Sequence, residues 1–168
     1  MIKIILHHKR FFLLLIFIVT SFIFAKEQEK KYPDIDFNLF NGKKISMNEL
    51  VSNGPIIMQF WAIWCAPCKK EMYYLNKIQE KYKNQGVSVI CVNTDNLKSM
   101  PKAKAYIRQK KYDLLIAKDP SSRIFNMLNA NVMPTTIVFD YNGQIIYRKE
   151  GYMHGDEKKV ESILKSIL

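Results

Sequence analysis

Two cysteines separated by two residues, Cys65 and Cys68, are the side chains of this sequence best suited to do chemistry. Trp64 precedes them, and they stand where an apolar, strand-like run gives way to a helical pattern. At the start of a helix, unpaired amides and the positive end of the helix dipole favour the thiolate form of Cys65. A thiolate attacks disulfides, and a second thiol one turn away resolves the mixed disulfide. The spacing therefore indicates thiol–disulfide exchange.

A structural disulfide and half of a metal site are the other interpretations of this pair. A zinc site needs a second pair of cysteine or histidine ligands. Beyond the motif the sequence holds only Cys91 and three histidines, none at ligand spacing, so no metal site is expected. Cys91 belongs to the apolar run 87–92 and is predicted to pack in the core as a small hydrophobic side chain.

The elements that position the motif follow from hydrophobic periodicity and turn residues. Residues 56–61 predict a buried strand, and the segment after Pro67 predicts an amphipathic helix that ends at Gly86. Proline fits the first turn of a helix because its missing N–H has no partner there in any case.

The rest of the chain predicts alternating strands and helices. Expected are a hairpin of 35–40 and 43–47, a short helix opened by the capping box 46–49, a strand at 87–92, a lysine-rich helix at 99–111, a strand at 114–117, a short helix from 119 to 128, a hairpin of 135–140 and 144–149, and a final helix from 156. This order implies an α/β protein with a mixed sheet and helices on both faces.

The first 25 residues read as a targeting segment, because three cations precede an apolar run at 11–24. The run is short for a membrane span, which favours a signal peptide cleaved after Ala25. Ile23 occupies a position where cleavage favours a small residue, so an uncleaved anchor stays open. Both alternatives export the domain. We expect a leader at 1–25, a charged linker at 26–31 and one domain at 32–168.

The net charge of +11 is spread over scattered lysines and no arginine-rich element is present, which argues against nucleic-acid binding. The basic helix at 98–111 is predicted to be a solvated surface. If the leader stays attached, this helix could instead rest near anionic lipid heads.

The motif segments resemble the TlpA/ResA-like branch of exported thiol–disulfide oxidoreductases in the thioredoxin superfamily. The resemblance covers about residues 32–168 and is carried by the segment from Phe60 to Glu71 and by Met133-Pro134-Thr135-Thr136, which is similar to the family's cis-proline loop. The stretch between Val92 and that loop is similar to the branch's central insertion. The resemblance implies a thioredoxin-like mixed central sheet with helices on both faces, an N-terminal β-hairpin and a central βα insertion.

Three residues are expected to do the chemistry. Cys65 is the predicted nucleophile and Cys68 the predicted resolving thiol, and no cofactor is expected beyond this redox-active pair. A carboxylate near a buried thiol has a raised pKa and can accept the thiol proton, so Glu71 is predicted to accept the proton of Cys68. The alternative is an ordinary solvated helix glutamate. In thioredoxin itself a buried aspartate on the preceding strand matches Gln59, which cannot move protons.

Substrate contacts are expected around the cysteines. Trp64 would offer a flat apolar surface, and Pro67 would fix the local geometry. By resemblance, Pro134 would be cis, and Met133 would pair its main chain with an extended substrate. A trans proline that opens a strand is the alternative for Pro134.

The resemblance implies a reductant in the cell envelope. It would act in the periplasm or at the outer face of the cytoplasmic membrane on exported thiol proteins such as apocytochrome c, and a membrane electron donor would recharge it. Membrane contact is expected only through residues 1–25, if uncleaved. An oxidase or isomerase of the same fold is the first alternative. A copper metallochaperone is a weaker one, because such carriers use two cysteines separated by three residues and a histidine.

Overall fold

The computed structural model describes residues 35–168. The predicted leader (1–25) and linker (26–31) lie outside the described residues, as do the first three residues of the predicted domain. Within the described part of the chain, no helix combines the length and the apolar character needed to cross a membrane.

Strands and helices alternate in the order that the sequence predicts. The elements are β1 (Asp36–Leu39), β2 (Lys44–Ser46), α2 (Met47–Asn53), β3 (Ile56–Trp61), α3 (Ala66–Tyr82), a 3₁₀ turn η2 (Lys83–Gln85), β4 (Ser88–Asn93), α4 (Met100–Lys110), β5 (Leu115–Lys118), α5 (Arg123–Met127), β6 (Thr135–Phe139), β7 (Ile145–Glu150) and α6 (Asp156–Ile167).

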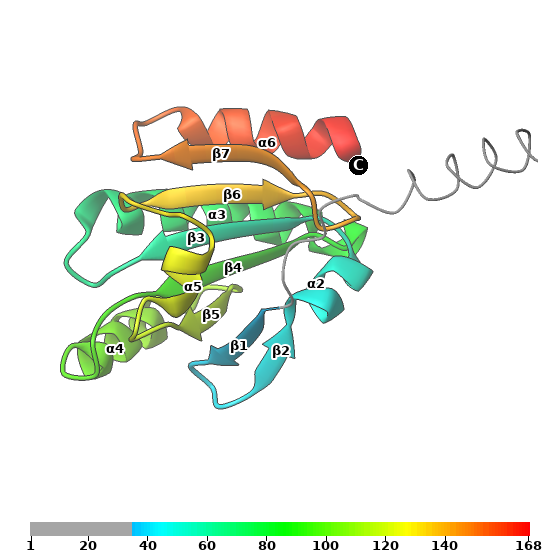
Figure 1. The fold of residues 1–168 in the computed structure, drawn as a ribbon. Coiled ribbons are helices and arrows are strands. Elements are labelled where there is room, and N and C mark those ends of the chain that lie inside the picture. Colours follow the sequence, from blue (N-terminus) through cyan, green and yellow to red (C-terminus); the bar gives the residue numbers. More distant parts are fainter. Residues whose placement is uncertain (1–34) are drawn as a thin grey trace, which may run out of the picture. The chain divides into compact units, whose positions relative to one another are not determined.

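The strands form one mixed sheet in the order β2-β1-β5-β4-β3-β6-β7 (Figure 1). Strands β3, β4 and β5 are parallel, whereas β1 and β6 run antiparallel to their neighbours. The predicted N-terminal hairpin is β1–β2. The predicted central insertion contributes β5, which lies between β4 and β1 in the sheet. The thioredoxin-like α/β architecture is thereby confirmed.

Strand β3 is buried along its whole length and serves both layers of the core. Successive side chains of a strand point to opposite faces. Ile57 and Trp61 join the cluster that packs against α3, α4 and α6, while Met58 and Phe60 join the cluster that packs against α2 and α5. Helices therefore cover both faces of the sheet, as predicted.

Local sequence signals place most element boundaries within a residue or two. The predicted capping box opens α2, because Ser46 Oγ accepts the N–H of Glu49 and Glu49 Oε2 accepts the N–H of Ser46. Helix α5 begins later than expected, at Arg123. The carboxylate of Asp119 accepts the N–H groups of Ile124 and Phe125, so the residues between Asp119 and the helix form a turn.

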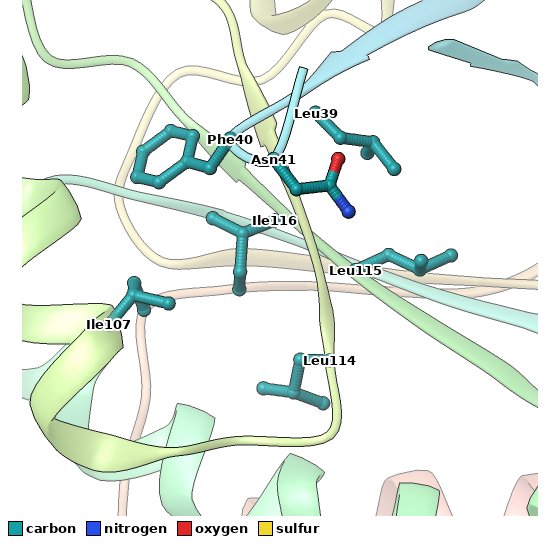
Figure 2. Close-up of a pocket in the computed structure, with 7 residues that line it drawn as sticks. All are labelled: Leu39, Phe40, Asn41, Ile107, Leu114, Leu115 and Ile116. Atoms are coloured by element: carbon teal, nitrogen blue, oxygen red, sulfur yellow. The ribbon is translucent and has the colours of Figure 1, made fainter. Parts of the chain in front are cut away.

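Helix α4 leaves a small apolar hollow where it meets the β1 and β5 region (Figure 2). Ile107 of α4, Phe40 after β1, and Leu114 and Ile116 of the β5 segment line a cavity of about 160 Å³. Neither Cys65 nor Cys68 lines this hollow.

The loop after α2 and the loop before β4 approach each other closely at Gly86. A single added methyl group there is therefore expected to lower the stability of the protein strongly. Gly86 has φ +83°, and a Cβ there would lie 2.1 Å from the carbonyl oxygen of Asn53. Gly86→Ala is expected to lower the free energy of unfolding by about 3 kcal/mol through positive φ and backbone overlap. Gly42→Ala is the matched control, since Gly42 has φ +87° but nothing within 4 Å. It should lose only about 1 kcal/mol in the same urea titration. Equal losses would contradict the role of the close approach.

Candidate active site

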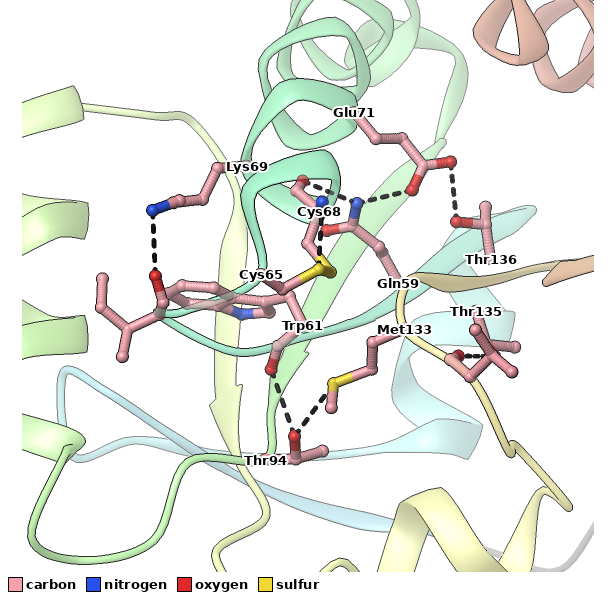
Figure 3. Close-up of a disulfide and its surroundings, with 12 residues drawn as sticks. Gln59, Trp61, Cys65, Cys68, Lys69, Glu71, Thr94, Met133, Thr135 and Thr136 are labelled. Carbon is pink, nitrogen blue, oxygen red and sulfur yellow. Dashed lines mark hydrogen bonds between the residues drawn. A yellow bond between two sulfur atoms is a disulfide. The ribbon is translucent and has the colours of Figure 1, made fainter. Parts of the chain in front are cut away.

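Cys65 and Cys68 form a disulfide at the first turn of α3 (Figure 3). Cys65 is the N-cap residue, and its Sγ accepts the backbone N–H of Cys68 at 3.2 Å. Pro67 lies in the first turn, as predicted. Cys65 keeps 4% of its surface exposed and Cys68 none. This asymmetry suits an attacking sulfur at the surface and a shielded resolving sulfur behind it.

Two hydrogen bonds hold the backbone of Ile63, in the loop before the cysteines. The N–H of Ile63 donates to Asp95 Oδ2 at 2.7 Å, and Lys69 Nζ donates to the carbonyl oxygen of Ile63 at 2.9 Å. Asn93 Nδ2 also donates to Asp95 Oδ2, at 2.8 Å. Sequence reasoning missed Asp95. Its position just after β4 was the available signal. The parallel strands β3 and β4 end at the same edge of the sheet, so a residue that follows β4 is expected near the loop that follows β3.

The two tryptophans near the motif have opposite environments. Trp61 is fully buried at the end of β3, as expected of a core residue, whereas Trp64 is 70% exposed beside Cys65. The exposed indole therefore leaves a flat apolar surface next to the disulfide.

The Met133–Pro134 peptide bond is cis, in the segment that opens β6. Pro134 is buried, and its carbonyl oxygen accepts the N–H of Gly151 at 2.7 Å. Met133 packs against the cluster that contains both cysteines, and its Sδ accepts the hydroxyl of Thr94 at 3.2 Å. The structure thus gives the predicted isomer and brings this loop to the cysteine pair.

Glu71 is buried inside α3, with only 1% of its surface exposed, so it is not the solvated glutamate of the alternative interpretation. Gln59 Nε2 donates to its Oε2 at 2.7 Å, and Thr136 Oγ1 donates to its Oε1 at 2.9 Å (Figure 3). The pKa of Glu71 is raised to about 7, mainly because the carboxyl group is buried. The two hydrogen bonds oppose this rise, whereas the charges of Asp156 and Glu157 add to it.

Gln59 connects this carboxylate to Cys68. Its Nε2 donates to the carbonyl oxygen of Cys68 at 3.1 Å as well as to Glu71. In the sheet Gln59 lies between Cys91 and Thr136, which are its register partners on β4 and β6. Gln59 therefore holds Glu71 in place without moving a proton itself. Thr136 belongs to the sequence motif that contains Pro134, but no local pattern predicts its contact with Glu71.

Cys91 is a free, fully buried cysteine on β4, which confirms the prediction of a core side chain. Burial raises the pKa of its thiol, and the neighbouring Glu71 carboxylate raises it further. A thiol that ionises this reluctantly is a poor nucleophile, so exchange chemistry belongs to the Cys65–Cys68 pair.

Known proteins are similar to this chain in sequence and in fold. The sequence model of the Redoxin family matches residues 27–164. The thiol-disulfide oxidoreductase ResA of Bacillus anthracis is 29% identical over 138 residues, which cover 82% of this chain and 77% of that protein. ResA of Geobacillus kaustophilus is 30% identical over 137 residues, covering 80% and 75%.

Solved structures of similar proteins have the same fold. A Chlorobium tepidum protein assigned as thiol:disulfide interchange protein DsbE superposes with a TM-score of 0.74 at 27% identity, covering 82% of this chain and 96% of that one. StoA from Bacillus subtilis has a TM-score of 0.64 at 21% identity, covering 78% and 96%, which shows the shared fold. The chain belongs to the Redoxin family and, with its Cys65–Cys68 pair on a thioredoxin-like fold, is a ResA-like thiol–disulfide oxidoreductase.

Proposed function

We propose that this protein reduces disulfides in exported proteins, apocytochrome c among them, and that the Cys65–Cys68 dithiol is its only redox group. The work would take place in the periplasm or at the outer face of the cytoplasmic membrane. A membrane electron donor would return the oxidised pair to the dithiol. The leader-like residues 1–25 support export, and the similarity to ResA and DsbE proteins supports the chemistry.

The reaction proceeds in two exchanges. The Cys65 thiolate attacks one sulfur of the substrate disulfide, which forms a mixed disulfide and releases the other substrate sulfur as a thiolate. Cys68 then loses its proton and attacks Cys65 Sγ, which releases the second substrate thiolate. The substrate gains two electrons and takes up two protons, while Cys65 and Cys68 lose two electrons and become the disulfide.

The observation that carries this proposal is the buried Glu71 carboxylate one turn after Cys68. Cys68 is fully buried, so its thiol needs a nearby base before it can attack. A carboxylate with a pKa of about 7 accepts and returns a proton near neutral pH. Gln59, bonded to both residues, keeps this base near the resolving cysteine.

Substrate recognition is proposed to use the surface around Cys65. Trp64 would contact an apolar side chain next to the reacting disulfide, with Pro67 fixing the turn that presents Cys65. The main chain of Met133, before the cis Pro134, would pair with an extended segment of the substrate in the manner of an added strand.

The reduction potential of the Cys65–Cys68 pair tests the direction of transfer. We expect a value near that of thioredoxin, about −270 mV, because the protein is proposed to donate electrons. The pair would be equilibrated with glutathione buffers, and the dithiol fraction measured by thiol alkylation and mass spectrometry. A value near about −120 mV would overturn the reductase proposal and favour the oxidase or isomerase alternative of the same fold.

A further inference from the structure

The segment 98–111, which contains α4, is the most strongly basic part of the chain. It holds six cations and no acid, against a net charge of +11 for the whole sequence. All six side chains are exposed. Together they make up the α4 basic segment: Lys98, Lys102, Lys104, Arg108, Lys110 and Lys111.

The charge of the α4 basic segment is not neutralised within residues 35–168. None of the ion pairs in this part of the protein involves one of its six members. The acids nearest in sequence are occupied elsewhere. Asp95 is buried and bonded to Ile63 and Asn93, and Asp113 pairs with Lys83 at 2.8 Å.

One side of α4, the side of Tyr106, borders the reactive cysteines. The Tyr106 ring of α4 lies 6.0 Å from the Trp61 ring, and Lys69 Nζ lies 5.6 Å from the centre of the same tyrosine. Lys69 in turn holds the Ile63 carbonyl, two residues before Cys65. In Figure 1 the loops that lead into α3 and into α4 leave the same edge of the sheet. A protein that reaches Cys65 therefore meets α4 as well.

The cations nearest the site form a row. Residues four apart are neighbours on a helix surface, so Lys102 and Lys110 flank Tyr106, and Lys110 Nζ lies 5.7 Å from its ring centre. Lys98 precedes the row in the loop before α4. From Lys102 to Lys110 the helix rises roughly 12 Å, which about four residues of extended peptide would span.

We propose that the row of Lys102 and Lys110, extended by Lys98, docks protein substrates that carry aspartate or glutamate residues beside the reacting disulfide. This inference rests on the proposed thiol–disulfide exchange and names its preferred substrate class. Acidic residues on the substrate and cations on α4 attract each other, which raises the rate of productive encounter. A substrate with a basic segment beside its disulfide is repelled by the same cations. The row is longer than a single small anion, and its place beside Cys65 favours a reaction partner over a lipid surface.

The test compares two disulfide-bonded peptides of the same length, one with glutamates and one with lysines flanking the disulfide. The second-order rate of oxidation of the reduced protein is measured for each at low and high salt. We expect the acidic peptide to react about 10-fold faster or more at low salt, with the preference shrinking at high salt because the charges are screened. The triple variant K98Q/K102Q/K110Q should lose most of this preference.

A matched variant, K43Q/K44Q/K165Q, removes three exposed cations from the β2 edge and the end of α6 and should keep the preference. An uncharged disulfide, 2-hydroxyethyl disulfide, should oxidise the wild type and both triple variants equally.

If 2-hydroxyethyl disulfide oxidises none of these proteins, both the proposed function and the docking proposal are wrong. If it reacts normally but the two triple variants behave alike with the peptides, only docking is overturned. Docking is also overturned, in favour of lipid binding, if K98Q/K102Q/K110Q loses binding to phosphatidylglycerol vesicles yet keeps the peptide preference.

Discussion

In a Cys68→Ser variant, substrate proteins are expected to accumulate as mixed disulfides with Cys65, and multiple-turnover reduction should fall by at least about 1,000-fold. Cys65 keeps its place at the N-cap of α3 and still attacks. Release then depends on thiols from solution, whose millimolar concentrations are far below the effective molarity of a neighbouring thiol. The adducts would be seen as high-mass bands on non-reducing gels of envelope extracts, and dithiothreitol should remove them.

Two further variants separate the roles of the three cysteines. Cys65→Ser should trap nothing, because Cys68 has no exposed surface from which to attack a protein substrate. Cys91→Ala, placed in the Cys68→Ser background, should leave the adducts unchanged because Cys91 is buried on β4. Equal trapping by Cys65→Ser and Cys68→Ser would show that the assignment of nucleophile and resolving thiol is wrong.

The parts of the fold that the sequence predicts are those with local causes. Strand β3 is indicated by a short apolar run whose six residues are all buried, and α2 by a capping box that closes within four residues. The asymmetry of the cysteines follows in the same way, since Cys68 falls on the apolar side of an amphipathic helix and Cys65 at its cap. Periodicity and capping act within a few residues, so one sequence is enough to see them.

The contacts that complete the site join residues far apart in the chain. Gln59 reaches Glu71 over 12 residues, and Thr136 reaches it over 65. Asp95 reaches Ile63 over 32 residues. Their partners are set by the register of β4 and β6 on β3, which no local pattern reports. The sequence could therefore nominate Glu71 but could not decide between a buried base and a solvated side chain.

Glu71→Gln should slow the resolution step by about 100-fold or more at neutral pH, because it removes the base proposed for Cys68. Gln keeps the size of the side chain and can still bond to Gln59 and Thr136. In a rapid-mixing experiment, decay of a preformed Cys65 mixed disulfide would be followed over a pH series that brackets neutrality. The decay rate of the wild type should rise with pH, with an apparent pKa of about 7. This rise should be absent from the pH profile of the variant. Unchanged profiles would refute the coupling of Glu71 to Cys68.

The same variant should reverse a pH-dependent loss of stability, which tests the burial of Glu71 independently of catalysis. The pKa of Glu71 is raised from 4.5 to about 7, so the folded protein binds this proton more tightly than the unfolded chain does. Stability contributed by the neutral carboxyl is complete below about pH 4.5 and declines as the pH rises to about 7, by about 3 kcal/mol in total. The Glu71→Gln side chain stays neutral, so it should not lose stability as the pH rises. In urea titrations its free energy of unfolding should therefore increase by about that amount relative to the oxidised wild type across this pH range.

Glu150→Gln, on an exposed carboxylate of β7, is the control and should show no such increase. Parallel curves for the wild type and Glu71→Gln would mean that the carboxylate is solvated in solution, and the proton-transfer role would lose its physical basis.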